Sequence, residues 1–403
     1  MVACPPAGEF RLCVRHDPCV TAGDSEQRPA ALEQRVTPLE LFFDLMFVFA
    51  ITQVTGFIAA HPTWTRLVEA LAILAVLWWA WVAYAWLGNT AASDDGAMRV
   101  VLLVAMGPLL VLSLAVPGAF GGDGLIFGVA YLCVRVLHLA GYLILARDDP
   151  ALRALVSRLA STMLPAVSLI VLAGFLDGVP RALCWIAALA VDYGGLALRG
   201  TDGWNVQPAH FAERHGLIII IALGESIVSL GVGASGLGLG ASVIVSALLG
   251  VVVAAALWWA YFDVVALAGE RRMERADATA QSRIARDSYT YLHFPMVTGI
   301  VLFALGVKES LIAESHRLSS VAAVSLCGGV ALYLLALSAF KRRNYGSFNY
   351  PRLAGATLLV ALIPVAGATR AVVALALVAA VTAALIAYET LRYAAARERI
   401  RNA

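Results

Sequence analysis

The sequence predicts an all-helical protein that crosses a membrane about twelve times, as two parallel repeats of six spans. Three observations predict this class. Of the 403 residues, 61% are hydrophobic and only 14% are charged, whereas soluble domains carry about 25% charged residues. Apolar stretches of about 20 residues, the length that crosses a bilayer, recur from residue 39 to the C-terminus. A short sequence in the first half of the chain also returns in the second half.

Twelve apolar stretches follow one another, separated by short segments that contain Gly, Pro or charged residues. The first six occupy residues 39–60, 67–87, 99–119, 125–146, 155–176 and 181–198. The second six occupy residues 216–234, 240–263, 289–307, 320–340, 353–369 and 371–392. Each is long enough, or nearly so, for a helix that spans the hydrocarbon core.

Basic residues in the connections predict the orientation, because Lys and Arg concentrate on the cytoplasmic side of a membrane. With twelve spans, 23 of the 29 Lys and Arg residues fall on the side of the N-terminus and five on the opposite side. Both termini are therefore predicted to be cytoplasmic. The predicted segments are a disordered cytoplasmic tail (1–35), a first six-helix repeat (36–198), a cytoplasmic linker (199–215), a second six-helix repeat (216–393) and a short cytoplasmic tail (394–403).

The internal repeat rests on the sequence Leu-Trp-Trp-Ala at residues 77–80, which returns 180 residues later at 257–260. An acidic residue precedes each copy at a similar distance, Asp44 in the first half and Glu225 in the second. Because six is an even number of spans, both halves would enter the membrane from the same side. They are then parallel repeats, related by an axis along the membrane normal.

Ionisable side chains inside the spans are the candidate functional residues, because each costs about 2.5–3.5 kcal/mol at the centre of a bilayer. Glu40 and Asp44 are four residues apart, so they share one face of the first span near its cytoplasmic end. Glu225 lies about nine residues, roughly 13 Å, into the seventh span. Arg135 and His138 share a face of the fourth span. Their similar depth makes Glu225 the predicted partner of Arg135, with Asp44 as a second candidate.

Two interpretations of these residues remain open. A buried ion pair can serve only to fix the packing of helices, and Glu40 can be an interfacial residue that the helix dipole favours. Alternatively, Asp44, Glu225 and Arg135 line a polar cavity between the halves that binds an ion or a solute. Asp192 in the sixth span could belong to this cavity or mark the end of its span.

A polar segment before the seventh span contains four candidates for a cytoplasmic gate, namely His210, Glu213, Arg214 and His215. Such a segment is more typical of an interfacial turn, but the same side chains could perform general acid–base catalysis. The three cysteines of the tail, Cys4, Cys13 and Cys19, lack the spacing of a zinc site. The sequence therefore predicts no metal and no cofactor, and a net charge of +2 gives no reason to expect a nucleic-acid partner.

Short motifs in both halves of the chain carry a family resemblance. The first span contains Glu-Leu-Phe-Phe-Asp-Leu at 40–45 and Phe-Val-Phe-Ala-Ile at 47–51. The second half contains His-Phe-Ala-Glu-Arg-His-Gly at 210–216 and Leu-Gly-Glu-Ser-Ile at 223–227. In these motifs the chain resembles the bacterial low temperature requirement A (LtrA) family of membrane proteins. The resemblance covers roughly residues 35–395. It implies a multi-pass bacterial membrane protein linked by name to growth in the cold, and it carries over no molecular activity.

Three functions are consistent with these features. A transporter or channel explains the predicted duplication and the acids within the spans, which are typical of proton- or ion-coupled sites. A membrane-embedded enzyme acting on a lipid or polyprenyl substrate would use the histidine cluster, although no catalytic motif supports it. A non-catalytic scaffold in the cold or stress response would need the charges only for assembly. The expected partners are the lipid bilayer of the bacterial cytoplasmic membrane and an unknown small solute or ion. The substrate and a homo-oligomeric state stay open.

Overall fold

The computed structural model describes residues 35–90, 96–201, 203–235, 238, 240–313 and 316–402. Within these residues every regular element is helical, and twelve candidate spans are long and apolar enough to cross a membrane. The predicted class, an all-α polytopic membrane protein, is therefore confirmed. Apart from Arg35, the tail predicted to be disordered lies outside the described residues, as do Cys4, Cys13 and Cys19.

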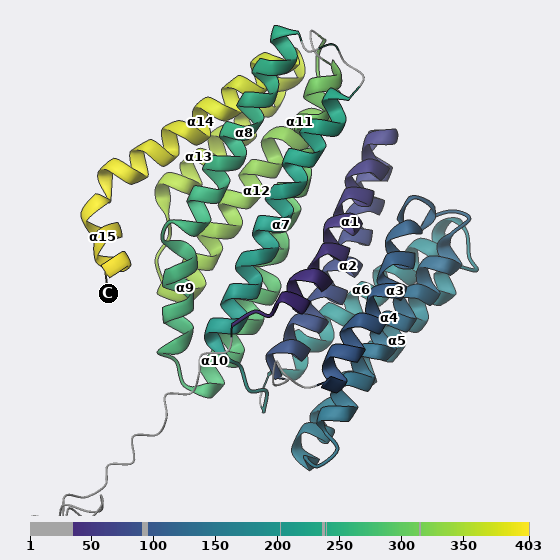
Figure 1. Cartoon of the computed structure of the whole chain (residues 1–403). Coiled ribbons are helices and arrows are strands. Elements are labelled where there is room, and N and C mark those ends of the chain that lie inside the picture. Colours follow the sequence, from purple (N-terminus) through teal and green to yellow (C-terminus); the bar gives the residue numbers. More distant parts are fainter. Residues whose placement is uncertain are drawn as a thin grey trace, which may run out of the picture. The chain divides into compact units, whose positions relative to one another are not determined.

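The first half of the chain forms six long helices (Figure 1). They are α1 (Pro38–Ala60), α2 (Trp64–Thr90), α3 (Gly96–Leu114), α4 (Gly124–Leu145), α5 (Pro150–Ala173) and α6 (Gly178–Arg199). A single 3-10 turn, η1 (Val116–Gly118), follows α3. All six agree with the apolar stretches of the first half to within a few residues at each end.

The second half also contains six long helices, with shorter segments between and after them (Figure 1). The long helices are α7 (Pro208–Ala234), α8 (Ala241–Phe262), α11 (His293–Ala313), α12 (Ser320–Tyr345), α13 (Tyr350–Ala368) and α14 (Ala371–Arg392). The shorter segments are α9 (Val265–Glu274), α10 (Ala278–Ile284), the π-helical η2 (Ala285–Tyr291) and α15 (Ala394–Asn402). Helix α9 extends the span of α8, while α10 and η2 precede α11 within one candidate span.

Helix α7 begins at Pro208, eight residues before the start that apolarity predicts. Pro208 occupies the first turn, where its fixed φ and missing N–H suit a helix start. The segment expected to be part of a cytoplasmic linker is therefore helical from residue 208, and His210, Arg214 and His215 are buried in it. Hydropathy underestimates this helix because its charged residues find partners on other helices.

The same pattern of neighbours occurs in both halves. In the first half, α1 packs on α2 and α3, α3 on α4, α4 on α5, α5 on α6, and α6 on α2. In the second half, α7 packs on α8 and α11, α11 on α12, α12 on α13, α13 on α14, and α14 on α8. The halves meet where α1 and α2 contact α7 and α11.

The closest helix packing lies between α11 and α12, where glycines allow the backbones to approach. A Cβ added at Gly306 would lie 2.5 Å from the Cα atom of Leu326, and one at Gly299 would lie 2.6 Å from the carbonyl oxygen of Gly329. Small residues at helix contacts are typical of membrane proteins, in which burial from water supplies little driving force between helices. Helices α11 and α12 therefore form a closely packed pair, and α7 packs against α11.

Candidate functional site

Four ionisable side chains meet where the N-terminal turns of α1 and α7 pack together. Arg214 donates from one guanidinium nitrogen to Oε1 of Glu40 at 2.8 Å and from the other to Oδ1 of Asp44 at 2.7 Å. The Nε2 atom of His210 lies 3.1 Å from both carboxylate oxygens of Glu40. All four side chains are buried. We call Glu40, Asp44, His210 and Arg214 the charge cluster.

Local sequence positions the acidic half of the charge cluster. Thr37 and Glu40 form a capping box, in which the Thr37 backbone N–H donates to the Glu40 carboxylate and the Glu40 N–H donates to the Thr37 hydroxyl. Glu40 therefore does have the role at a helix N-terminus that one sequence interpretation assigned to it, and it is also paired. One helical turn further, Asp44 accepts a hydrogen bond from the Trp81 indole at 3.0 Å.

A glycine in α2 makes room for the charge cluster. A Cβ added at Gly88 would lie 2.5 Å from Oε1 of Glu40 and 3.3 Å from an Arg214 guanidinium nitrogen. Any side chain at this position would therefore push against the ion pair itself. Helix α2 thus contributes both the Trp81 donor to Asp44 and the space that the Glu40–Arg214 pair occupies.

Glu225 lies elsewhere along the same helix interface and has different neighbours. Thr55 Oγ1 lies 2.6 Å from its Oε1 atom, Ser229 Oγ lies 2.9 Å from the same oxygen, and Thr52 Oγ1 hydrogen-bonds to Oε2. Glu225 is 1% exposed. No Lys, Arg or His of the described residues lies within ion-pair distance of it. We call Glu225, Thr52, Thr55 and Ser229 the hydroxyl site.

The two sites share one register between α1 and α7. The contacts Glu40–His210, Asp44–Arg214 and Thr55–Glu225 each join residues that are 170 positions apart. The two helices are therefore parallel and level with each other along their shared length. Asp44 and Thr55 are eleven residues apart on α1, which separates the two sites by roughly 16 Å.

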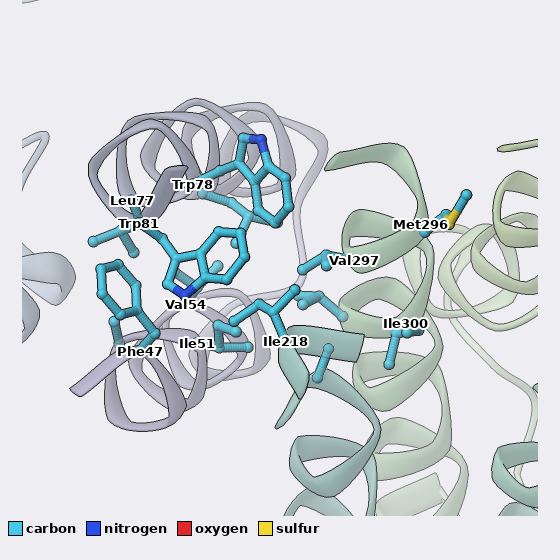
Figure 2. Close-up of a cluster of buried hydrophobic side chains, with 14 of the residues drawn as sticks. Phe47, Ile51, Val54, Leu77, Trp78, Trp81, Ile218, Met296, Val297 and Ile300 are labelled. Atoms are coloured by element: carbon cyan, nitrogen blue, oxygen red, sulfur yellow. The ribbon is translucent and has the colours of Figure 1, made fainter. Parts of the chain in front are cut away.

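Apolar side chains fill the space between the two sites. Figure 2 shows Phe47, Ile51 and Val54 of α1 beside Ile218 of α7 and the indoles of Trp78 and Trp81. Phe47 and Ile51 follow Asp44 and precede Thr55, while Ile218 lies between Arg214 and Glu225 in sequence. The charge cluster and the hydroxyl site are thus separated by a buried apolar layer.

Arg135 does not pair with Glu225 or Asp44, so the predicted pair is wrong. Its guanidinium lies 3.3 Å from the Asp192 carboxylate and donates to the Tyr131 hydroxyl at 2.9 Å. The reason is the packing of the first half, in which α2 and α5 each contact both α4 and α6, the helix that carries Asp192. Asp192 is buried beside Arg135, whereas Asp44 and Glu225 contact other residues at the α1–α7 interface, so these four side chains do not line one shared cavity.

His138 and Tyr142 continue the polar face of α4 beside this pair and border a cavity of about 100 Å³. Both His138 ring nitrogens, the Tyr142 hydroxyl and the Arg135 Nε atom are buried without a hydrogen-bond partner among the described residues. Buried polar groups normally have partners, and the cavity has room for a few water molecules or a small solute. Trp79, Trp86 and Trp204 contribute apolar walls.

The four gate candidates lie in three different environments. His210 and Arg214 belong to the charge cluster, whereas Glu213 accepts a hydrogen bond from the Val36 backbone N–H at 3.0 Å. The His215 Nδ1 atom lies 2.8 Å from the Phe211 carbonyl, to which it donates, and its other nitrogen is buried without a partner. The predicted cluster of four is therefore not a single site.

The family assignment follows from comparison with known proteins. The sequence model described as "Bacterial low temperature requirement A protein (LtrA)" matches residues 35–387. The chain belongs to the LtrA family. An uncharacterized protein of Rhizobium meliloti (strain 1021) is 29% identical over 334 residues, which cover 80% of this chain and 81% of that protein. No solved structure matches this LtrA chain.

Sequence reasoning missed a histidine and its partners in this LtrA protein. His293 begins α11 one residue after the end of η2, and its Nε2 atom accepts a hydrogen bond from the Tyr261 hydroxyl at 2.8 Å. Its ring stacks on Tyr289 and lies 5.2 Å from the ring of His215. The available signal was the residue type, because His293 is an ionisable side chain inside the apolar stretch predicted at 289–307. A π-helical segment of this kind is frequent at functional sites.

Thr52 and Thr55 were also missed as ligands of Glu225. Their spacing of three residues on one face of α1 is visible in the sequence, but threonines inside an apolar span more often bond their own helix. Among the described residues, no group of three or more His, Cys, Asp or Glu side chains is placed to hold a metal ion.

Proposed function

We propose that this LtrA-family protein is a transporter or channel in which Glu225 binds a proton or a cation during transport. The site lies on the interface between the two halves, where relative movement of the halves would change access to it. The observation that carries the proposal is the hydroxyl site, a buried carboxylate that hydroxyl groups surround and that no basic side chain in the described part of the chain neutralises.

The hydroxyl site can satisfy either protonation state of Glu225. Thr52 Oγ1 lies 3.0 Å from the Val48 carbonyl, and Thr55 Oγ1 lies 3.0 Å from the Thr52 carbonyl. When Glu225 is protonated, its O–H donates to the hydroxyl oxygen of Thr52 or Thr55, and that hydroxyl donates in turn to a backbone carbonyl. When Glu225 is ionised, the hydroxyls rotate and donate to the carboxylate, since a hydroxyl both donates and accepts. A bound cation would instead use the hydroxyl and carboxylate oxygens as ligands.

The arrangement of the helices supports a duplicated transporter architecture. Both halves have the same pattern of neighbouring helices, and α1 and α7 pack in parallel with contacts between residues 170 positions apart. A pseudo-two-fold axis between α1 and α7 accounts for both observations. In duplicated transporters, substrate and ion sites lie at the interface between repeats, which rock against each other.

The repeated Leu-Trp-Trp-Ala sequence is weaker support for the duplication than the offset of 170 residues between α1 and α7. Trp78 is 3% exposed beside the interface, whereas Trp258 is 44% exposed. The proposed repeat therefore rests on the helix pattern and the offset of 170, because the longer α7 and its following loop bring the offset of the next helix to 177 and not to 180.

Other parts of the proposal concern solute, membrane and assembly. The cavity at Arg135, His138 and Asp192 is the proposed place for a small polar solute, because its unpartnered atoms can donate and accept hydrogen bonds. The excess of basic residues in the connections supports the bacterial cytoplasmic membrane, with both termini cytoplasmic. A role in growth at low temperature and a homo-oligomeric state stay predictions.

Flux through proteoliposomes tests the proposed function. The full chain is reconstituted, proton and potassium gradients are imposed in turn, and internal pH and potassium are measured. We expect the wild type to carry flux and Glu225→Gln to lose it, because the amide cannot release a proton or neutralise a cation. Glu69→Gln, at a half-buried position near the start of α2, is the matched control and should keep full flux. Undiminished flux in Glu225→Gln would contradict the proposed role.

A further inference from the structure

A second concave site lies in the other half of the protein, away from the α1–α7 interface. It is a pocket of about 640 Å³ bordered by residues of α8, α9, α12, α13, α14 and α15. Its lining contains seven basic side chains and two acidic ones, Asp263 and Glu389. In the predicted orientation, α8 and α14 reach this pocket at their cytoplasmic ends. We call it the basic pocket.

Both acidic residues of the basic pocket are already paired. Arg352 donates to both oxygens of Glu389, at 2.9 and 3.0 Å, and Asp263 forms ion pairs with Arg397 and Arg401. These contacts join α13 to α14 and α8 to α15. They leave the carboxylates unable to neutralise the other basic groups of the pocket.

The remaining basic groups lack acidic partners. No carboxylate of the described residues lies within ion-pair distance of Arg271, Arg272, Arg275, Lys341 or Arg399. Arg271 and Arg272 donate instead to the backbone carbonyls of Ile400 and Asn344, which hold their side chains against the pocket. Five cations around one concavity repel one another, and a bound anion would relieve that repulsion.

An apolar groove continues directly from the basic pocket. It runs between α13 and α14 and shares Tyr350, Pro351 and Tyr393 with the pocket. Small residues form its floor, among them Ala354 and Ala384. The groove residues on α13 extend from Tyr350 to Leu358, a length of about 12 Å. Exposed tyrosines at its mouth are typical of the level of lipid headgroups.

We propose that the basic pocket and the groove together bind one anionic phospholipid. The phosphate lies among Arg275, Lys341 and their basic neighbours, and an acyl chain lies in the groove over Ala354 and Ala384. A soluble anion would use only the basic pocket, and a second copy of the protein would bring no excess of negative charge. An anionic lipid matches both chemistries in the order in which they occur, and basic pockets between helices on the cytoplasmic side are suited to such headgroups.

Lipid titration followed by native mass spectrometry tests the headgroup. The full chain in detergent is titrated with phosphatidylglycerol, phosphatidylcholine and inorganic phosphate. We expect one bound phosphatidylglycerol, with at least about tenfold weaker binding in the double variant R275Q/K341Q. The control R147Q/R283Q removes two exposed basic residues outside the pocket and should bind as the wild type does.

A second pair of variants tests the groove. Ala384→Trp fills the groove and should weaken phosphatidylglycerol binding, whereas Ala383→Trp, on the neighbouring exposed position of α14, should not. Equal binding of phosphatidylcholine, or unchanged binding in R275Q/K341Q, would overturn the proposal. So would displacement of the lipid by millimolar phosphate, which indicates a soluble-anion site, or a dimer that the pocket variants dissociate, which indicates a second copy.

Discussion

The two polar sites on the α1–α7 interface differ in how their charges are balanced. At the N-terminal end, Arg214 bridges two carboxylates and His210 contacts one of them. Further along these helices, the partners of Glu225 among the described residues are all hydroxyl groups. Paired charges hold one another and cost much to separate, whereas a carboxylate among hydroxyls can gain or lose a proton without breaking an ion pair. On this difference we propose that the charge cluster serves assembly, and the proposed ion exchange needs only the hydroxyl site.

The largest expected effect is on removal of the central cation. Arg214→Met leaves Glu40 and Asp44 buried without their basic partner, which should destabilise the fold by about 3–5 kcal/mol. Thermal unfolding of the purified protein in detergent measures this loss. Arg317→Met, at an exposed position, should have little effect. If Arg214→Met unfolded at the wild-type temperature, the charge cluster would not be holding the halves together.

Replacing one acid of each site by its isosteric amide tests the difference between the charge cluster and the hydroxyl site directly. Asp44→Asn removes a charged acceptor from Arg214 and should cost about 2 kcal/mol. Glu225→Gln keeps groups that can donate to and accept from the hydroxyls, so its cost should be below about 1 kcal/mol. Unfolding measured under the same conditions gives both values. The opposite order would assign the structural role to Glu225.

The smallest effect is expected at the hydroxyls themselves. Thr55→Val removes a donor to Glu225 and should destabilise the protein by about 1 kcal/mol, a usual magnitude for hydrogen bonds between membrane helices. Thr382→Val is the matched control, because that buried hydroxyl bonds only carbonyls of its own helix. We also expect Thr55→Val to shift the pH dependence of flux, which Thr382→Val should leave unchanged. Identical behaviour of the two variants would show that Thr55 does not act through Glu225.

Most of the fold could be predicted from the sequence, because a span is a local property. Twenty apolar residues in a row predict a membrane helix regardless of what that helix packs against. The principal error was at α7, whose first two turns contain His210, Arg214 and His215. These residues resemble a loop in composition, and only their contacts with α1 and with the surrounding aromatic rings make their burial understandable.

The candidate site could be predicted as a set of residues but not as a set of pairs. Asp44, Glu225 and Arg135 are conspicuous because ionisable groups are rare inside spans. The depth of a residue within its span does not show which helix packs beside it. Depth predicts Glu225 as the partner of Arg135, whereas in the structure Asp192 of α6 pairs with Arg135. Helix adjacency decides the pairing, and adjacency is not a local property.

The sequence by itself determined the membrane class, the twelve spans and the family, since hydropathy and short motifs are read along one dimension. Only the tertiary structure decided that Arg214 pairs with Glu40 and Asp44, whereas Glu225 accepts hydrogen bonds from Thr52, Thr55 and Ser229. The physical reason is that a buried charge is stabilised by whatever group the packing brings within about 3 Å. Apart from Ser229, which lies on the same helix as Glu225, these neighbours come from a helix about 170 residues away in the chain.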